Sequence, residues 1–161
     1  MRFRSLLILL FALVVNCTTA AAQRAVIIVR HAERLDTSTD SPLSDVGRAR
    51  AERLSSELKD AGITAIYTTQ YRRTIETAEP LAKALGIKAE VVAATEQAKL
   101  LDRIRTVNAN DVVLIIGHGN TLPTIIKALG AKEEVTIADA EYTNLFIFIP
   151  GPTPLLLRLR F

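Results

Sequence analysis

The run from Asp111 to Ile116 constrains the fold of this chain more than any other segment. After the aspartate it reads Val-Val-Leu-Ile-Ile, and Gly117-His118-Gly119 follows at once. A continuous apolar run of this length is typical of a strand that is buried on both faces in a parallel sheet. The segment therefore predicts a central strand that ends at a histidine.

Strand-like and helix-like segments alternate along the rest of the chain. The predicted strands are 25–29, 63–68 and 89–93, and the predicted helices are 44–61, 71–85, 96–107 and 120–129. Such alternation indicates a mostly parallel sheet with helices on both faces. Leu145–Ile149 and Leu155–Phe161, joined by Pro150-Gly151-Pro152, predict an antiparallel hairpin at one edge. The expected fold class is an α/β three-layer sandwich with a C-terminal edge hairpin.

Several residues mark where the predicted helices begin and end. Ser44 or Asp45 can cap the first helix, and Gly62 is expected to stop it. Pro80 lies inside the second helix and predicts a kink or a boundary there. Asn120 is expected to cap the last helix.

The N-terminal segment has the pattern of an export signal. Two arginines precede an apolar stretch from Ser5 to Val15, and small residues follow it. Ala20-Ala21-Ala22 offers a cleavage site and predicts Gln23 as the mature N-terminus. We expect a signal peptide at 1–22, one domain at 23–161, and a periplasmic or secreted protein.

Cys17 leaves an alternative open. The residues before it partly resemble a bacterial lipoprotein box, in which the cysteine is lipidated, but Asn16 stands where a small residue is expected. We expect Cys17 to leave with the signal peptide, and a lipid anchor remains the alternative. A mature chain without it has no cysteine, which excludes disulfides, thiol catalysis and cysteine-bound metals.

The charge of the mature chain argues against a nucleic-acid partner. The whole chain has 20 basic and 17 acidic residues, and the signal peptide contains two arginines and no acids. The mature chain therefore has 18 basic and 17 acidic residues, a net charge of +1. Such a balance predicts no binding to nucleic acid, and we expect no membrane span in the mature chain.

Three polar segments follow predicted strands. His31 follows 25–29, His118 follows 111–116, and the segment from Thr69 to Ala78 follows a third strand. The carboxyl ends of parallel strands form the usual ligand site of such sheets. Each segment also has a simple structural explanation, because a single histidine can be structural and a helix can begin with solvated arginines.

Together these segments resemble the histidine phosphatase superfamily, also called the phosphoglycerate mutase-like family. Its R-H-G/A motif matches Arg30-His31-Ala32, and its S-x-x-x-R-x-x-Q/E-T-A segment matches Thr69 to Ala78, which places the family arginine on Arg73. The family's second histidine matches His118, and its L-S/T-x-x-G-x-x-Q/R-A segment matches Leu43 to Ala51. The resemblance extends in order over the predicted mature chain.

The resemblance implies a catalytic role for His31 and for three phosphate-binding side chains. His31 would accept the phosphoryl group, and Arg30, Arg73 and His118 would bind the phosphate oxygens. Arginine suits that task because its planar fork gives paired, charge-assisted hydrogen bonds to phosphate and stays protonated. Both histidines are then assigned, so we expect no metal and no cofactor.

The proton donor for the leaving group is less well defined. In the acid phosphatase branch an acidic residue follows the second histidine, but Gly119 stands there in this chain. In the mutase-like branch the donor is a glutamate in the middle of the chain, and Glu96 is the nearest candidate in order. Glu96 is equally explained as an acid in the first turn of a helix.

The leading hypothesis is an exported, metal-independent phosphatase that acts on small phosphomonoesters or phosphorylated protein side chains. A mutase-type isomerase is the first alternative, although it calls for a lid, and the sequence shows no large insertion that could form one. A non-catalytic phosphate-binding relative is the second.

Overall fold

The computed structural model describes residues 24–106 and 110–161. The predicted signal peptide, Cys17 and the predicted helix end at Val107 lie outside the described residues. The strands are β1 (Ala25–Arg30), β2 (Ile63–Thr68), β3 (Glu90–Val91), β4 (Val112–Gly117), β5 (Asn144–Ile149) and β6 (Leu155–Arg160). The helices are α1 (Asp45–Leu58), α2 (Arg72–Leu85), α3 (Gln97–Thr106) and α4 (Leu122–Leu129).

The strands form one six-stranded sheet in the order β3-β2-β4-β1-β5-β6. β1 and β2 both pair parallel with β4, and β3 pairs parallel with β2. Every residue of β4 is buried, as the apolar run of its sequence predicts. Because Arg30 lies opposite Gly117 in the β1–β4 register, the residues after these two strands emerge side by side.

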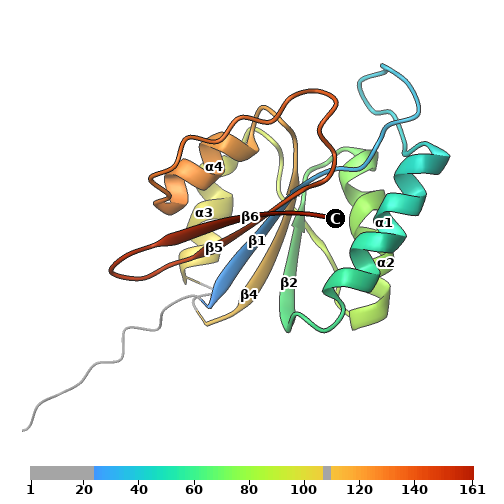
Figure 1. Ribbon diagram of the computed structural model, residues 1–161. Helices are drawn as coiled ribbons and strands as arrows, with labels where there is room; N and C mark the ends of the chain where they lie inside the picture. Colours follow the sequence, from blue (N-terminus) through green and yellow to red (C-terminus); the bar gives the residue numbers. More distant parts are fainter. Residues whose placement is uncertain (1–23, 107–109) are drawn as a thin grey trace, which may run out of the picture.

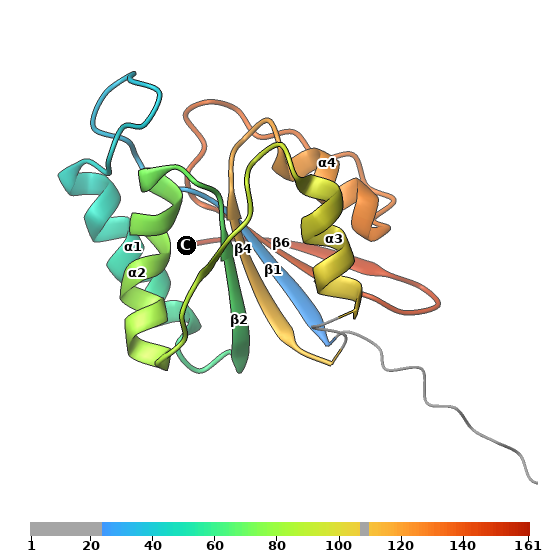
Figure 2. The same cartoon turned by 180° about the vertical axis from the view of Figure 1, so that it is seen from behind.

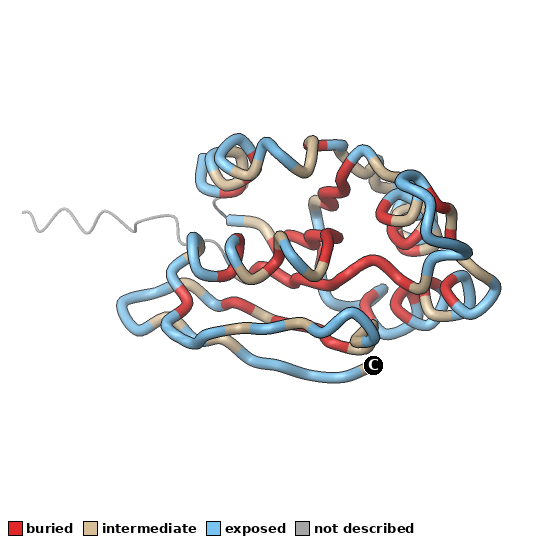
Figure 3. Tube along the Cα trace, turned by 90° about the horizontal axis from the view of Figure 1, so that it is seen from above, coloured by how far each residue is buried: buried red, intermediate tan, exposed pale blue. Residues whose placement is uncertain are grey.

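Two helices cover each face of the sheet, so the predicted three-layer α/β sandwich is confirmed (Figures 1 and 2). On one face, Leu54 of α1 and Leu81 of α2 pack with Leu114 of β4. On the other face, Ile104 of α3 and Ile126 of α4 pack with the opposite side chains of the strands. The buried residues in Figure 3 accordingly follow the central strands and the inner sides of the helices. None of the helices in the described chain is both long and apolar enough to cross a membrane.

The predicted C-terminal hairpin is also confirmed. β5 pairs antiparallel with β1 and with β6, which forms the outer edge of the sheet. Leu155, Leu157 and Leu159 of β6 are exposed because α1 and α2 cover the central strands and leave this edge open.

Two predicted boundaries are wrong by a few residues. The strand predicted at 89–93 has only the two residues Glu90 and Val91, since it pairs with β2 alone. The first helix ends at Leu58, before Gly62, which has φ +70° in the turn that leads into β2.

Two expectations about helix signals also differ from the structure. Thr121, and not Asn120, precedes α4, and its hydroxyl accepts a hydrogen bond from the backbone of His118 at 3.2 Å. Pro80 lies within α2 without ending it, because Ala78 and Leu81 on either side pack against the sheet.

Candidate active site

The four side chains expected to bind and receive phosphate meet in one cleft at the carboxyl edge of the sheet. Arg30 ends β1 and His31 follows it, His118 follows β4, and Arg73 lies in the first turn of α2. All four line a cleft of about 320 Å³. The other residues lining it are Arg34, Tyr71, Ala94, Gly119, Asn120, Thr121 and Asp139.

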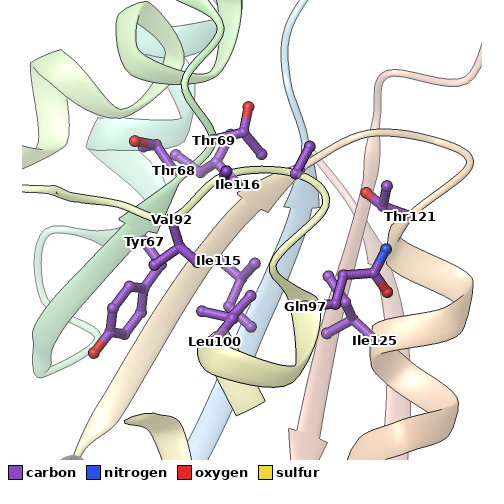
Figure 4. A pocket seen from close by; sticks show the side chains of 13 residues that line it. Tyr67, Thr68, Thr69, Val92, Gln97, Leu100, Ile115, Ile116, Thr121 and Ile125 are labelled. Carbon is purple, nitrogen blue, oxygen red and sulfur yellow. The ribbon is translucent and has the colours of Figure 1, made fainter. Parts of the chain in front are cut away.

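Three other hollows of the described chain contain neither histidine, and one of them, of about 130 Å³, lies beside Arg50 and Arg53. A larger one of about 570 Å³ lies beside α1 and α2. A cavity of only about 20 Å³, shown in Figure 4, lies at the ends of β2 and β4 and is lined mainly by apolar side chains. That space holds about one water molecule. The cleft with both histidines is therefore the candidate active site.

His31 is fixed in one orientation by its backbone and its ring. Its backbone N–H donates to the Gly117 carbonyl at 2.9 Å, which continues the pairing of β1 with β4. Its Nδ1 lies 2.7 Å from the carbonyl oxygen of Ala32. A carbonyl oxygen only accepts, so Nδ1 bears the hydrogen and Nε2 keeps its free electron pair.

The surroundings of His31 keep its ring neutral. The pKa of His31 is lowered to about 3, mainly by burial and also by the charges of His118, Arg30 and Arg73, while the Ala32 hydrogen bond opposes the shift. A neutral imidazole is the form that can attack phosphorus. The ring is therefore in its nucleophilic form throughout the neutral and mildly acidic range.

His118 lies next to His31, with 5.2 Å between the ring centres. Its Nε2 shares a hydrogen bond of 3.0 Å with the Thr69 hydroxyl. A hydroxyl group both donates and accepts, so this contact is compatible with either protonation state of the ring. The pKa of His118 is lowered to about 4, mainly by burial and also by the charges of Arg73 and Arg30.

Arg30 is held by a loop from the C-terminal part of the chain. Its Nη1 donates to the carbonyl oxygens of Ala138 at 2.9 Å and Asp139 at 2.8 Å. Its guanidinium carbon lies 4.3 Å from the centre of the Tyr142 ring. Because both bonds use Nη1, Nη2 remains available to a bound anion.

Arg73 is held in the same way by a different loop. Its Nη1 donates to the Thr39 carbonyl at 2.8 Å, and its guanidinium carbon lies 4.4 Å from the centre of the Tyr71 ring. The same Tyr71 ring meets His118 edge to face at 5.3 Å. Backbone carbonyl contacts, two for Arg30 and one for Arg73, and one aromatic face thus position each arginine.

Two residues at the end of the Thr69 to Ala78 segment join α2 to the rest of the site. The Thr77 hydroxyl accepts from the backbone N–H of Ala32 at 3.0 Å and donates to the Arg73 carbonyl at 2.6 Å. Glu76 accepts from the backbone N–H of Leu43 at 2.7 Å. These side chains support the site and do not enter the cleft.

The Leu43 to Ala51 segment supports the backbone just after His31. A Cβ at Gly47 would lie 2.1 Å from the carbonyl oxygen of Glu33, so only glycine allows α1 to approach this closely. The Glu33 carboxylate accepts hydrogen bonds from Arg50 at 2.8 and 2.9 Å. Burial would raise the pKa of Glu33, but Arg50 outweighs it and lowers that pKa. Glu33 therefore anchors α1.

Glu96 lies outside the cleft. It precedes α3, is exposed, and its Oε2 lies 3.2 Å from Nζ of Lys99. Ala94 borders the cleft instead. Asp139 supplies the only carboxylate among the residues that line the cleft in the described chain.

Sequence analysis did not identify Arg34, Tyr71 or Tyr142 as parts of the site. Tyr71 stands within the Thr69 to Ala78 segment, and Arg34 follows the Arg30-His31 pair closely, so proximity to a motif was the available signal. Tyr142 reaches Arg30 only through the fold, and no motif marks it. Within residues 24–106 and 110–161, no three histidine, cysteine, aspartate or glutamate residues are grouped so that they could hold a metal ion.

Comparisons with known proteins agree with this geometry. Residues 26–97 match the family model of the histidine phosphatase superfamily (branch 1). A probable phosphoglycerate mutase GpmB of Proteus mirabilis is 38% identical over 66 residues, which cover 37% of this chain and 31% of that protein. The chain thus matches about a third of the length of its curated relatives.

Solved structures share the fold at low sequence identity. A mycobacterial glucosyl-3-phosphoglycerate phosphatase superposes with a TM-score of 0.65 at 14% identity, covering 78% of this chain and 89% of that one. The protein histidine phosphatase SixA, complexed with tungstate, gives 0.65 at 15% identity, covering 84% and 96%. The family match over residues 26–97, together with the paired histidines and arginines at the carboxyl edge of the sheet, makes this chain similar to the histidine phosphatase superfamily.

Proposed function

We propose that this protein is a phosphatase that hydrolyses phosphomonoesters through a phosphohistidine on His31. The observation that carries the proposal is the state of the His31 ring. Its Nδ1–H is fixed on the Ala32 carbonyl, its pKa is lowered to about 3, and it lies in one cleft with two arginines. This arrangement leaves Nε2 free to attack an anion that the arginines bind.

Binding comes first, because the oxygens of a phosphate dianion repel an approaching nucleophile. Arg30 and Arg73 neutralise that charge, and His118 adds a hydrogen bond. A bound dianion favours the protonated form of His118, which opposes the lowering of its pKa by burial. The Thr69 hydroxyl can keep its contact with the ring in either state.

Two displacements then follow. Nε2 of His31 attacks phosphorus, a P–N bond forms, and the bond to the leaving oxygen breaks. Water next attacks the phosphohistidine, the P–N bond breaks, and the nitrogen regains its electron pair. The two hydrogens of the water end on the released alcohol and on inorganic phosphate. Dividing one hard displacement into two easier ones is the benefit of the covalent step.

The placement of Glu96 suggests a preference for good leaving groups. Its carboxylate is engaged with Lys99, and Ala94 occupies the border of the cleft. A leaving group that needs no strong acid, such as an aryl oxide, suits this site best. Glu96→Gln is therefore expected to slow alkyl and aryl phosphates equally. Selective slowing of alkyl phosphates would make Glu96 the acid after all.

The test is a panel of phosphomonoesters and phosphopeptides with the purified protein beside its His31→Ala variant. We expect hydrolysis that resists EDTA, is inhibited by vanadate and is lost in the variant. Rapid quench in alkaline detergent with ³²P-labelled substrate is expected to trap a phosphoenzyme only in the wild type, and later treatment with acid should release its phosphate. Activity that survives His31→Ala or disappears with EDTA would exclude this mechanism.

A mutase is the second candidate, because the curated relatives are named probable phosphoglycerate mutases. A mutase must hold its phosphoryl group until an acceptor binds, whereas a phosphatase gives it to water. An assay coupled to enolase, with a phosphorylated primer, measures the isomerisation directly. Isomerisation faster than phosphate release would favour the mutase.

We also propose that the protein acts outside the cytoplasm, on small phosphorylated molecules or phosphoproteins. The sequence pattern of residues 1–22 supports this location. Cell fractionation with N-terminal sequencing tests it, and the expected mature N-terminus is Gln23. A labelled lipid on Cys17 would instead indicate an anchored protein.

A further inference from the structure

Arg34 lines the same cleft as Arg30 and Arg73 but has no role in the transfer of the phosphoryl group described above. The other two arginines are each held by carbonyl oxygens and an aromatic ring. The guanidinium of Arg34 forms no hydrogen bond or ion pair within the described part of the chain. It is exposed, so the donors of its fork are open to a ligand.

The backbone at Arg34 is nevertheless well fixed. Arg34 forms an antiparallel bridge with Leu43, and the N–H of Leu35 donates to the Pro42 carbonyl at 2.9 Å. These contacts close the neck of the loop over residues 35–42. The side chain of Arg34 therefore extends toward the cleft from a defined point and not from a loose segment.

Within the described residues, the positive charge at this side of the cleft is offset only at a distance, because Asp36 acts on Arg34 and Asp40 acts on Arg73 without forming an ion pair. Burial lowers the pKa of Arg73, and the positive charge of Arg34 is the next largest cause of that shift. The carboxylate of Asp36 lies on the same loop, but it accepts from the backbone N–H of Ser38 at 2.8 Å and forms no ion pair with Arg34. An anion bound between the two arginines would offset their repulsion.

We infer that Arg34 forms a second anion subsite, and that preferred substrates carry another anionic group besides the phosphoryl group. A carboxylate or a second phosphate has the required chemistry, since both accept paired hydrogen bonds from a guanidinium. This inference rests on the proposed function, because the phosphoryl group must occupy the site at His31 for its leaving group to reach Arg34.

The experiment compares four substrates of similar size on the wild type and on Arg34→Gln. Phenyl phosphate has no second anion, 3- and 4-carboxyphenyl phosphates add a carboxylate, and 1,4-phenylene bisphosphate adds a phosphate. For each substrate we take the ratio of kcat/KM in the wild type to kcat/KM in the variant. The intrinsic reactivity of the leaving group is the same in both proteins, so it cancels in this ratio. We expect that ratio to be about tenfold larger for a substrate with a second anion, which corresponds to one charge-assisted contact.

The source of the second anion follows from the same data. A larger ratio for a carboxyphenyl phosphate indicates a carboxylate, and a larger ratio for the bisphosphate indicates a phosphate. Arg34→Lys is expected to recover part of the loss, because lysine keeps the charge and lacks the fork. Ratios within twofold of the phenyl phosphate value for every anionic substrate would overturn the inference.

Arg72→Gln is the matched control. Arg72 is also exposed and lies next to Arg73 in sequence, but it pairs with Glu76 at 3.1 Å and does not line the cleft. We expect this variant to leave all substrates unchanged. An equal effect of both variants would show a general effect of surface charge and would exclude a subsite at Arg34.

Failure of the proposed function can be separated from failure of this inference. If no substrate turns over, calorimetry can measure the affinities of benzylphosphonate and 4-carboxybenzylphosphonate for the wild type and for Arg34→Gln. Weaker binding of the carboxylated probe alone in Arg34→Gln would support the subsite without catalysis. Equal affinities of wild type and variant for both probes would exclude it.

Discussion

The cleft consists of two half-sites that share a composition and differ in how firmly their histidines are held. One half-site contains His31, Arg30 and Tyr142, and the other contains His118, Arg73 and Tyr71. In each, an aromatic ring stacks on the arginine. The His31 ring is bonded to a carbonyl, which fixes its tautomer, whereas the His118 ring is bonded to a hydroxyl, which leaves its tautomer open.

Under the proposed function, this difference suits the two histidines to two different tasks in one cleft. A nucleophile needs one nitrogen that is always free, and a carbonyl partner on the other nitrogen secures that. A residue that supports a changing charge has to tolerate gain and loss of a proton, and a hydroxyl partner permits both. The partner of each ring thus assigns its role.

Replacing each of the two histidines is the strongest test of whether the half-sites have different roles. His31→Gln is expected to lower kcat by at least about 10³-fold, since it removes the atom that bonds to phosphorus. His118→Gln is expected to lower kcat by roughly 10²-fold and to retain the phosphoenzyme, because it removes only one hydrogen bond to the transition state. Rapid quench and steady-state kinetics measure both. Loss of the phosphoenzyme in both variants would mean that both histidines are needed to form it, and that the half-sites do not have separate roles.

Arg30 and Arg73 are expected to contribute equally to phosphate binding. Arg30→Lys and Arg73→Lys should each lower kcat/KM by roughly tenfold to 10²-fold, because lysine keeps the charge and loses the paired geometry. Steady-state kinetics with an aryl phosphate and the affinity for vanadate are the measurements. A tenfold difference between the two variants would show that one half-site carries most of the phosphate binding.

Protein stability should reveal the burial of both rings. The pKa values of His31 and His118 in the folded protein, about 3 and about 4, lie below 6.5, the ordinary value. The unfolded chain therefore binds more protons between about pH 4 and pH 6.5. The free energy of unfolding falls as the pH falls through that window, by roughly 1 to 2 kcal/mol per pH unit for the two groups.

Urea unfolding between pH 4 and pH 8 checks this, and above about pH 7 the two histidines should contribute no slope. Each of His31→Asn and His118→Asn should remove part of the slope. An unchanged slope in the double variant would assign the pH dependence to other groups.

The tyrosines are expected to give the smallest effect. Tyr71→Leu and Tyr142→Leu remove the ring beneath an arginine, and a stacked guanidinium is worth about 0.5 to 1 kcal/mol at such a site. We expect KM to rise about two- to fivefold. Phenylalanine variants should retain wild-type KM, since they keep the ring. If they lose as much as the leucine variants, the hydroxyl and not the stacking is what matters.

The sequence was sufficient to predict the layers of the fold and the residues of the half-sites that lie close to strand ends. The apolar run before His118 and the shorter one before His31 place both rings at one edge of a parallel sheet. Arg73 followed from its place in the Thr69 to Ala78 segment, at the start of a helix.

The partners of these residues could not be predicted in the same way. Tyr142 and the carbonyl oxygens of Ala138 and Asp139 come from a segment without strand or helix periodicity, and only the tertiary fold brings it to Arg30. Glu96 shows the limit of reasoning from order in the chain, and its predicted role as proton donor stays a prediction. Its order in the chain suggested the cleft, but the turn before α3 directs it to Lys99.

The Thr77 hydroxyl belongs to neither half-site and touches both. It accepts from the residue after His31 and donates to the carbonyl of Arg73. A shift of α2 along its axis would therefore move the backbone next to His31 together with Arg73. Under the proposed function, Thr77 would help to keep the distance between His31 and the bound phosphate constant, and an error of about 1 Å in that distance is enough to slow such a reaction.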